Sequence, residues 1–593
     1  MYILGISCFY HDAAAALLKD GVLVAAAQEE RFTRVKHDPS FPIHAIAFCL
    51  TQAGITAADL DYVVFYEKPF VKFERLLLSI AATFPRSWRV FRDAMPTWLG
   101  EKLWIKGLIR DRLAIAKERI LFVDHHLSHA ASAIYCSPFA AAAILTVDGV
   151  GEWTTTAWGQ GTADWQGNGE NRLALAEEIH FPHSLGLLYS AFTAFLGFAV
   201  NEGEYKVMGM APFGEPKYVD KVERLCRINA DGSFTLDMSY FSYHYHSQRA
   251  FSQKFVALFG EPRDPGARFV TAQTSLYDDR TPPSRAELER NQYYADVAAS
   301  LQKVLEEAMV KLARHAHAAT GLNALCLAGG VALNSVANYH ILTRTPFREL
   351  YIQPAAGDAG GALGAALYVY HVILGHKRQF VMDRADWGAE YGEEAVASFL
   401  REHGISAERH ENEEHLLERV VDGLVSGKVV GWCQGRFEWG PRALGHRSIL
   451  ADPRRAEMKD TVNIKIKFRE PFRPFAPSVL LERAGEFFAL PEAARHYPAR
   501  FMLYVSPVRR PDVIPAVTHV DGTGRLQTVS RTANPRYYRL IELFGQATGI
   551  PALLNTSFNL KGEPIVSTPA EAFATFSRSG MDWLVLGRYL VTK

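Results

Sequence analysis

The chain has 593 residues, which is too long for one core, so we expect two or three domains. Lys plus Arg and Asp plus Glu both number 64, and this zero formal charge argues against a nucleic-acid partner or a polybasic membrane surface. Six cysteines without C-x-x-C spacing are typical of reduced thiols in a cytoplasmic protein. The chain starts directly as an apolar strand without a signal peptide, and its longest uncharged run favours a buried helix over a membrane span. We therefore expect a cytoplasmic protein with no membrane anchor.

The first forty residues place a histidine between two predicted strands. Residues 2–8 and 14–30 read as strands, and the second run turns as a hairpin at Asp20-Gly21. A strand, a small polar turn and a second strand also form the phosphate-facing hairpin of actin and sugar-kinase ATPases. His11 in this turn is either a structural histidine or a general base. The charge run at 29–37 is either solvated or the basic edge of a pocket.

Residues 66–118 mix aromatic side chains with Lys and Arg. This pattern predicts amphipathic helices that cover the core. A lid over the substrate or a contact between subunits is the more specific functional alternative. Nucleic acid is the less favoured partner, because acidic residues and aliphatic runs interrupt the basic ones.

Two histidines four residues apart follow a short predicted strand at 120–123. If a helix begins there, His125 and His129 share one helical face, where two imidazoles can bind one metal ion. A buried, hydrogen-bonded histidine pair is the alternative. The next apolar strand, 141–147, ends at Asp148, which is positioned to add a carboxylate.

Paired glycines then occur in two strand–glycine–helix units, at 324–338 and 350–364. Glycines at the end of a buried strand let a nucleotide approach backbone amides at a helix N-terminus. Neither unit matches a Walker A or a Rossmann fingerprint. Asp358 in the second unit is a further candidate metal carboxylate. A predicted helix at 184–200 precedes a loop at 201–214 that contains Lys206, three glycines and a proline, which suits close approach to a ligand.

The composition shifts at about 375–415, where we expect the first domain to end. Arg and Lys then gather beside glycines and prolines between 436 and 473, without helical spacing. A solvated surface would carry more acidic residues, so this segment favours an anion pocket for a phosphate.

Together these segments resemble the NodU/CmcH-type O-carbamoyltransferases, a family that includes antibiotic carbamoyltransferases. The resemblance covers nearly the full length, and the joint occurrence of its motifs in order is highly specific. The motifs lie at 5–14, 29–32, 125–130, 206–211, 328–334, 357–360, 436–448, 469–477 and 555–559.

The resemblance implies an α/β protein with two catalytic domains. Residues 1–380 would form an actin/sugar-kinase-like duplicated ATPase domain, similar to threonylcarbamoyl-transferring ATPases, and residues 390–593 a YrdC-like α/β domain. Carbamoyl phosphate would be cleaved in the YrdC-like domain. The carbamoyl group would reach ATP in the other domain, giving carbamoyladenylate and pyrophosphate, and a substrate hydroxyl would then release AMP.

The resemblance also assigns site residues. Four side chains would hold Fe(II), although two imidazoles and two carboxylates also suit Zn(II) or Mn(II); Mg is a further candidate. His11 would be the general base for the acceptor hydroxyl. The metal ligands would be His125, His129, Asp148 and Asp358; the nucleotide-binding residues Lys206, Gly329, Gly330, Asn334, Gly360 and Gly361; and the carbamoyl-phosphate-binding residues Arg442, Arg447, Lys467, Arg473, Arg525 and Ser557.

The predicted acceptor is a hydroxyl of a small metabolite or glycoside, as in natural-product or Nod-factor-type biosynthesis. We expect no nucleic-acid or membrane partner, and a homo-oligomer stays open. A threonylcarbamoyl enzyme that modifies tRNA is one rival, opposed by the balanced charge and the second domain. A non-catalytic nucleotide-sensing protein is another, opposed by the intact His11 and metal-ligand set.

Overall fold

The computed structural model describes residues 1–274 and 282–593. These residues form two compact units. Unit 1 comprises residues 1–29, 37–267 and 292–381. Unit 2 comprises residues 382–593 together with 30–36 and the described part of 268–291. From the sequence we expected the last two segments to belong to the N-terminal domain. Among the described residues, none of the helices combines the length and apolar character that a membrane span needs.

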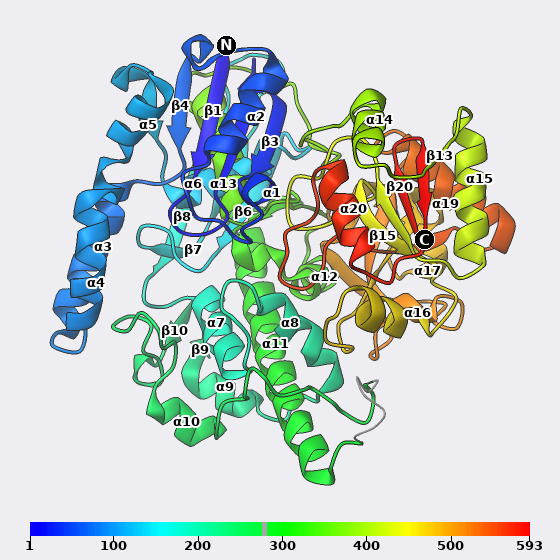
Figure 1. The fold of residues 1–593 in the computed structure, drawn as a ribbon. Helices are drawn as coiled ribbons and strands as arrows, with labels where there is room; N and C mark the ends of the chain where they lie inside the picture. The colour runs from blue at the N-terminus through cyan, green and yellow to red at the C-terminus, as the bar shows by residue number, and fades with distance from the viewer. Residues whose placement is uncertain (275–281) are drawn as a thin grey trace. The chain divides into compact units, whose positions relative to one another are not determined.

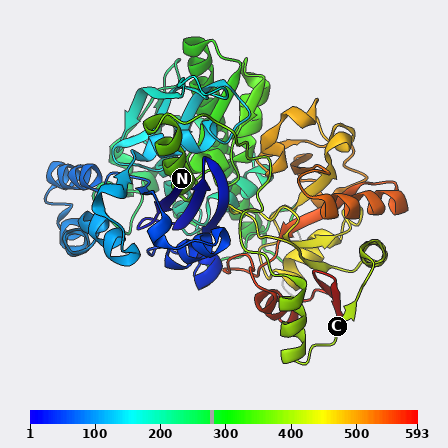
Figure 2. The same cartoon turned by 90° about the horizontal axis from the view of Figure 1, so that it is seen from above.

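Unit 1 contains two five-stranded sheets with the same topology (Figures 1 and 2). In each sheet three antiparallel strands are followed by two strands parallel to the first of them, in the spatial order third, second, first, fourth, fifth. The fold of unit 1 is therefore duplicated. The first sheet has β1 (Tyr2–Ser7), β2 (Ala14–Lys19), β3 (Val22–Gln28), β4 (Tyr62–Phe65) and β5 (Ile120–Phe122), and the second has β6 (Ala141–Val147), β7 (Thr154–Thr162), β8 (Arg172–His180), β11 (Ala324–Ala328) and β12 (Glu349–Tyr351).

Two helices connect these sheets at the centre of unit 1. α13 (Asp358–Tyr368) packs on the first sheet, α6 (His125–Ile134) packs on the second, and the two helices pack on each other. The contacts leave no room for side chains: a Cβ on Gly5 would lie 1.8 Å from the Ala362 carbonyl oxygen, and a Cβ on Gly364 would lie 1.8 Å from that of Ser128. Glycine therefore sets how closely the layers approach.

The other helices of unit 1 lie around this centre. α3, α4 and α5 confirm that residues 66–118 are helical, and α7 begins at the residue after Ser184, whose side chain caps it. A two-stranded sheet joins β9 (Cys226–Ile228) and β10 (Phe234–Leu236). The remaining helices are α2 (Ile43–Ala53), α3 (Pro69–Thr83), α4 (Trp88–Gly100), α5 (Ile105–Leu113), α7 (Leu185–Phe195), α8 (Glu204–Met210), α9 (Val219–Leu225), α10 (Gln253–Phe259), α11 (Arg285–Thr320, whose first turns belong to unit 2) and α12 (Ser335–Arg344).

Unit 2 is built on one nine-stranded mixed sheet in the order β13-β21-β20-β14-β15-β19-β16-β18-β17. Its central strands are buried along their length, which suits the apolar runs of the sequence. The strands are β13 (Glu408–Arg409), β14 (Val430–Cys433), β15 (Arg447–Ala451), β16 (Ala476–Leu480), β17 (Tyr504–Pro507), β18 (Thr523–Val529), β19 (Ala552–Ser557), β20 (Trp583–Leu586) and β21 (Tyr589–Thr592).

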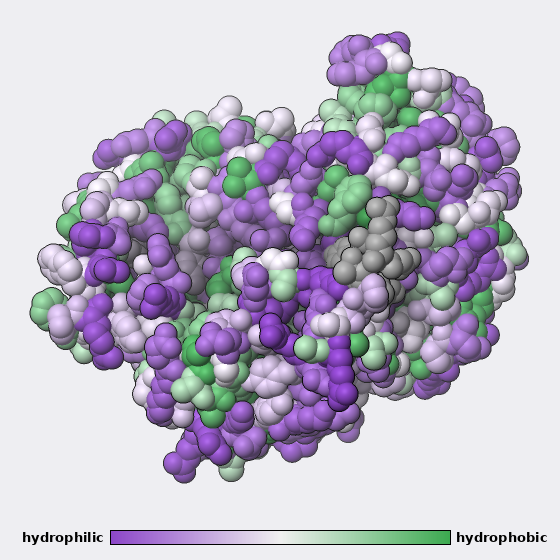
Figure 3. Space-filling model, turned by 60° about the horizontal axis from the view of Figure 1, so that its bottom comes forward, coloured by the Kyte–Doolittle hydropathy of each residue, from purple (hydrophilic) through white to green (hydrophobic). Residues whose placement is uncertain are grey.

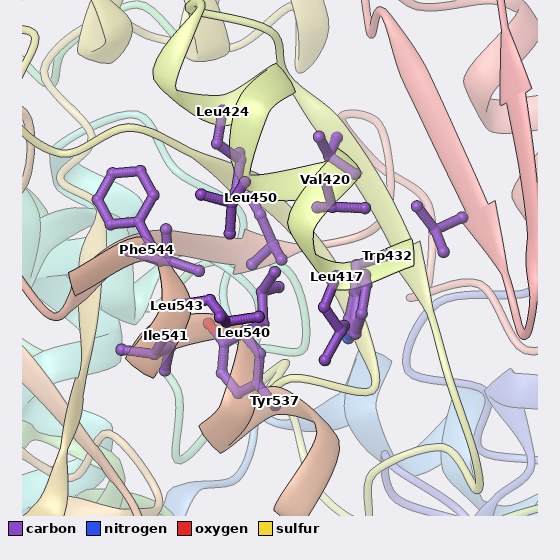
Figure 4. Packing of buried hydrophobic residues seen from close by; sticks show 14 of the residues in the cluster. Leu417, Val420, Leu424, Trp432, Leu450, Tyr537, Leu540, Ile541, Leu543 and Phe544 are labelled. Carbon is purple, nitrogen blue, oxygen red and sulfur yellow. The ribbon is translucent and has the colours of Figure 1, made fainter. Parts of the chain in front are cut away.

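Two amphipathic helices cover one face of this sheet. Apolar side chains of α15 (Glu413–Val425) and α19 (Pro535–Thr548) point toward one another above Trp432 and Leu450 (Figure 4). Both helices repeat apolar residues at i, i+3 and i+7, as a helix with one buried face requires. The other helices are α1 (Glu30–Thr33), α14 (Glu393–Glu402), α16 (Met458–Asp460), α17 (Ala484–Phe487), α18 (Tyr497–Arg500) and α20 (Pro569–Ser577).

The surface has an ordinary polar character on the face drawn in Figure 3, where hydrophobic residues are scattered among hydrophilic ones.

Candidate functional site

Four predicted metal ligands converge at the centre of unit 1. The Nε2 atoms of His125 and His129 lie 3.0 Å apart, and Nε2 of His125 lies 3.2 Å from Oδ2 of Asp148. Oδ1 of Asp358 lies 3.6 Å from Nε2 of His125 and 3.5 Å from that of His129. One ligand atom from each residue fits within 4.8 Å of the others, and all four residues are buried.

The duplicated topology explains this convergence. His125 begins α6 directly after β5, Asp148 follows β6, and Asp358 begins α13 after β12. Asp148 and Asp358 lie at one edge of the second sheet, because β6 and β12 run parallel within it and end at the same edge. The histidines come from the end of β5 in the first sheet and reach this edge on α6, which packs on β6, β11 and α13. His125 and His129 are one helical turn apart, so α6 presents both rings to the same point.

The chemistry of the cluster fits a cation. Among the described residues, neither carboxylate oxygen of Asp358 has a hydrogen-bond partner, although the side chain is 1% exposed. A buried carboxylate without a donor is costly unless a cation or a proton neutralises it. Burial lowers the pKa of His125, but the Asp358 and Asp148 carboxylates raise it more, so this pKa lies well above its usual value. The cluster thus attracts positive charge.

Acidic residues that the sequence analysis did not single out surround His125. The Glu152 carboxylate accepts hydrogen bonds from the backbone N–H of His125, at 3.0 and 3.1 Å, and from that of Lys68, at 2.7 Å. It thereby satisfies a free donor at the N-terminus of α6. Glu67, which is buried and paired with Lys72, places Oε2 3.8 Å from Nδ1 of His125. In the sequence, Glu152 lies four positions after Asp148, and this spacing alone does not distinguish its role.

His11 lies beside the cluster and belongs to a chain of three side chains. Its Nε2 is 3.9 Å from Oδ2 of Asp358, and its Nδ1 is 3.0 Å from Oδ2 of Asp12. The other Asp12 oxygen is 2.7 Å from Nδ1 of His37. Burial lowers the pKa of His11, but Asp358 and Asp12 raise it to about 9. Asp12 therefore holds Nδ1 of His11 and leaves Nε2 directed at the cluster.

The first glycine pair contacts the same cluster. The Gly330 backbone N–H donates to Oδ1 of Asp148 at 2.8 Å, which fixes the carboxylate while Oδ2 contacts the histidine. Gly329 has a φ of 95°, and a Cβ there would lie 2.3 Å from the Val147 carbonyl oxygen. Only glycine fits this close approach of two strand ends.

The other predicted nucleotide-binding residues have packing roles. Gly360 and Gly361 lie inside α13, where added Cβ atoms would meet Gln353 at 1.9 Å and Tyr66 at 2.8 Å. Asn334 caps α12 by accepting from the Ala337 N–H. Packing and capping alone account for these residues, so their role toward a nucleotide stays a prediction. Lys206 lies on α8, half-buried, with its ammonium over the Phe198 ring.

In unit 2 the structure brings two of the predicted carbamoyl-phosphate ligands into contact. Nζ of Lys467 donates to Oγ of Ser557 at 3.0 Å, to the Ser557 carbonyl at 2.6 Å and to Oδ1 of Asn559 at 2.9 Å. Burial, together with the nearby charges of Arg469 and Arg473, lowers the pKa of Lys467 well below its usual value. This is a dense positive cluster that an anion would stabilise.

Of the four remaining predicted ligands, Arg473 places its charge near Lys467, and the other three lie elsewhere in unit 2. Arg447 is 1% exposed and donates to the backbone carbonyls of Gln434, His446 and Ser567. Arg525 lies in β18, near His519. Burial and the Arg525 guanidinium both lower the pKa of His519. Arg442 is half-buried in the loop between β14 and β15. A cavity of about 160 Å³ lies at the end of β14 and includes Arg447, Arg536 and Arg588 in its lining.

Comparisons with known proteins place the chain in a family. Residues 2–367 match the family model described as carbamoyltransferase N-terminus, and residues 421–593 match the one described as carbamoyltransferase C-terminus. The chain belongs to the carbamoyltransferase family. The resemblance to the NodU/CmcH-type enzymes that the motifs indicated is thereby confirmed.

Three relatives illustrate the breadth of this family. An uncharacterized protein of Synechocystis is 47% identical over 100% of this chain and 97% of its own length. The nodulation protein NolNO of Sinorhizobium fredii is 39% identical over 99% of this chain and 79% of its own length. A 3'-hydroxymethylcephem-O-carbamoyltransferase of Streptomyces clavuligerus is 32% identical over 53% of this chain and 58% of its own length. The family membership and the named O-carbamoyltransferases make this chain a carbamoyl-transferring enzyme.

Proposed function

We propose that this carbamoyltransferase uses ATP and carbamoyl phosphate to carbamoylate a hydroxyl of a small metabolite or glycoside. Water would cleave carbamoyl phosphate to carbamate and phosphate. A carbamate oxygen would attack the α-phosphorus of ATP, giving carbamoyladenylate and pyrophosphate. The acceptor oxygen would then attack the carbamoyl carbon, lose its proton and release AMP. The observation that carries this proposal is the buried cluster of His125, His129, Asp148 and Asp358.

We assign the steps to two domains, residues 1–380 and 390–593. An actin-type ATPase fold for the first is supported by the two sheets with identical strand order. A YrdC-like fold for the second is supported by the family resemblance alone. In this assignment adenylate formation and transfer belong to the first domain, and carbamoyl-phosphate cleavage to the second.

The four-residue cluster would hold a divalent cation, for which the unpartnered Asp358 carboxylate and the facing imidazoles are the support. Fe(II) follows the family, while Zn(II), Mn(II) and Mg are the alternatives. When bound, the ion would supply Lewis acidity and a template for phosphate oxygens. Asp148 would keep its orientation through the Gly330 N–H.

His11 would take the proton of the acceptor hydroxyl on Nε2. The Asp358 charge raises the pKa of His11 to about 9, so this role requires that a cation held by Asp358 offset that charge and leave the imidazole neutral. Asp12 supports this role because it occupies Nδ1 and so leaves Nε2 for the acceptor. Although burial raises the pKa of the Asp12 carboxyl, its hydrogen bonds with His11 and His37 lower this pKa well below its usual value, so the carboxylate would stay ionised.

Lys467, Ser557 and Arg473 would bind the phosphate of carbamoyl phosphate. A phosphate dianion would replace the carbonyl and hydroxyl oxygens that now accept from Nζ, and it would offset the mutual repulsion of the cations. We keep the prediction that Arg442, Arg447 and Arg525 bind carbamoyl phosphate. Of these, Arg447 already donates hydrogen bonds to backbone carbonyls.

One assay tests the proposal. Purified protein would be given ATP, labelled carbamoyl phosphate and Fe(II), and pyrophosphate and carbamoyladenylate would be measured. We expect both products from the wild type and neither from Asp148→Ala. Pyrophosphate release that is absent, or equal in this variant, would overturn the proposal. His11→Ala should spare adenylate formation and slow transfer, and equal loss of both steps would reject the base assignment.

A further inference from the structure

A buried ion pair beside the four-residue cluster has no part in the function proposed so far. Nζ of Lys72 lies 2.5 Å from Oε2 of Glu67, and the two residues are 6% and 4% exposed. Lys72 belongs to α3, in the helical segment 66–118. A buried ion pair is costly because both charges lose their hydration, and apolar side chains of similar size often stabilise a fold as well or better. Stability alone therefore does not account for this pair.

The topology of the first sheet sets Glu67 beside His125. β4 and β5 are parallel neighbours, with Phe65 opposite Phe122 in their register. Glu67 follows the end of β4 by two residues and His125 follows the end of β5 by three, so both leave the same edge of the sheet. The first turn of α3 then brings Lys72 back to the Glu67 carboxylate. The backbone of the sheet thus places a charged pair next to the first histidine of the cluster.

The two ring nitrogens of His125 have different neighbours. Nε2 lies 3.0 Å from Nε2 of His129 and 3.2 Å from Oδ2 of Asp148. Nδ1 has no hydrogen-bond partner among the described residues, and it lies 3.8 Å from Oε2 of Glu67. A neutral imidazole carries its proton on one nitrogen and a lone pair on the other. An anionic acceptor beside Nδ1 therefore favours the proton there and leaves the lone pair of Nε2 for a metal ion.

We propose that Glu67, held by Lys72, is the positioning residue of His125 in the metal centre proposed above, on which this role rests. Glu67 sets the tautomer of the imidazole and the direction of its ring. At 3.8 Å the contact between Oε2 and Nδ1 is longer than a hydrogen bond, and a shift of about 1 Å or less would bring the two atoms within hydrogen-bonding distance. Glu67 acts through His125 and is not itself a metal ligand.

Lys72 makes Glu67 available as an anion. Its ammonium contacts Oε2 of Glu67, the same oxygen that faces His125, and it also lies 5.0 Å from the centre of the Tyr10 ring. A cation that meets both a carboxylate and an aromatic face is stabilised by both. The Tyr10 ring lies 4.7 Å from that of His11. α3 thus supplies one buried charge beside the site, which gives part of residues 66–118 a role toward the metal centre.

Metal binding by charge-balanced variants of the full chain tests the proposal. Glu67→Met/Lys72→Met removes the carboxylate and the ammonium together, so the net charge beside the cluster is kept and the acceptor at Nδ1 is lost. Glu67→Gln/Lys72→Met has the same net charge but keeps an amide oxygen at that position. Lys217→Met/Asp296→Asn is the matched control, since this pair, 3.2 Å apart, also joins a lysine to a buried carboxylate, but the carboxylate lies on α11. Equilibrium dialysis would give the Fe(II) dissociation constants, and calorimetry the thermal midpoints of the metal-free proteins.

We expect the dissociation constant to rise about 10–100-fold in Glu67→Met/Lys72→Met, to recover most of this loss in Glu67→Gln/Lys72→Met, and to stay unchanged in the control. The thermal midpoint of Glu67→Met/Lys72→Met should equal or exceed that of the wild type, because two buried charges are gone. Wild-type affinity in this variant, no recovery with glutamine, or a loss of affinity that comes with a lower midpoint would overturn the proposal. A wild type that binds no Fe(II) would refute the metal centre itself, and this role of Glu67 with it.

Discussion

Glu152 is expected to control both the stability of α6 and the affinity of the proposed metal site, although it is not one of the four proposed ligands. Its carboxylate accepts three backbone hydrogen bonds, two from the His125 N–H and one from the Lys68 N–H, and the side chain is buried. Glu152→Ala would leave both N–H groups without an acceptor at the N-terminus of the helix that carries both histidines.

The magnitude follows from these contacts. Loss of a charge-assisted acceptor costs about 1.5–3 kcal/mol, and the uncompensated helix N-terminus adds about 1 kcal/mol. We therefore expect Glu152→Ala to lower the free energy of unfolding of unit 1 by about 2–4 kcal/mol. Each residue contributes about 2 cal/mol/K to the entropy of unfolding, so the thermal midpoint of a unit of this size should fall by about 3–6 °C.

Calorimetry and equilibrium dialysis with Fe(II) would measure the two effects. Glu152→Gln is the control, because its amide oxygen keeps one acceptor and the shape of the side chain, and it should lose about half as much stability. Metal affinity should fall in the same order, with alanine below glutamine. A Glu152→Ala variant with the wild-type midpoint and wild-type metal affinity would refute the reasoning.

Further predictions concern other residues. Asp358→Asn should lower the Fe(II) affinity more than tenfold by equilibrium dialysis, because the buried carboxylate is lost; unchanged binding would remove Asp358 from the ligand set. Gly329→Ala should destabilise unit 1 by about 2 kcal/mol or more in calorimetry, since the Cβ would meet the Val147 carbonyl at 2.3 Å; a neutral effect would contradict the close approach. Lys467→Ala should raise the carbamoyl-phosphate concentration that gives half-maximal pyrophosphate release, with little change for ATP. Because the pKa of Lys467 is lowered, its side chain loses the ammonium charge at a lower pH than an ordinary lysine does. Carbamoyl-phosphate affinity should therefore fall as pH rises through that pKa. The free energy of unfolding should rise with pH, because the folded state favours the neutral amine. A carbamoyl-phosphate affinity that stays constant from acidic pH up to the usual titration range of lysine would contradict this assignment.

Much of the local structure could be predicted from the sequence because short patterns carry it. The turn at Asp20-Gly21, the strand that ends at Asp148 and the helix that begins at His125 all have their expected places. These elements depend on alternation, on capping and on glycine, which act over a few residues. The helices within 66–118 could be predicted for the same reason, because the amphipathic pattern that indicates them acts over a few residues.

The assembly of the site depends on contacts that no local pattern contains. Asp358 lies beside Asp148 because β12 pairs with β11, and β11 with β6, within the second sheet, and it meets the histidines because α13 packs on α6. The pairing order of a sheet follows from the whole chain, so the sequence could suggest four ligands without showing that their strand ends meet.

The residues around the ligands were missed for a related reason. Glu152 and Asp12 act through hydrogen bonds to a backbone and to neighbouring rings, and an isolated acidic residue has no spacing that distinguishes this role. Gly360 and Gly361 also have a packing role that the sequence did not indicate, because the structure buries them within α13 against Gln353 and Tyr66, while their role toward a nucleotide stays a prediction.

The most direct test of the central claim is a titration of metal-free protein with Fe(II) in which bound metal and pyrophosphate release are measured together. With ATP and carbamoyl phosphate present, the account predicts that activity rises with bound metal and reaches a plateau at one equivalent per chain. Asp358→Asn should show neither tight binding nor release. Full pyrophosphate release by the metal-free wild type, or by Asp358→Asn, would contradict the claim that this buried cluster is the catalytic metal centre.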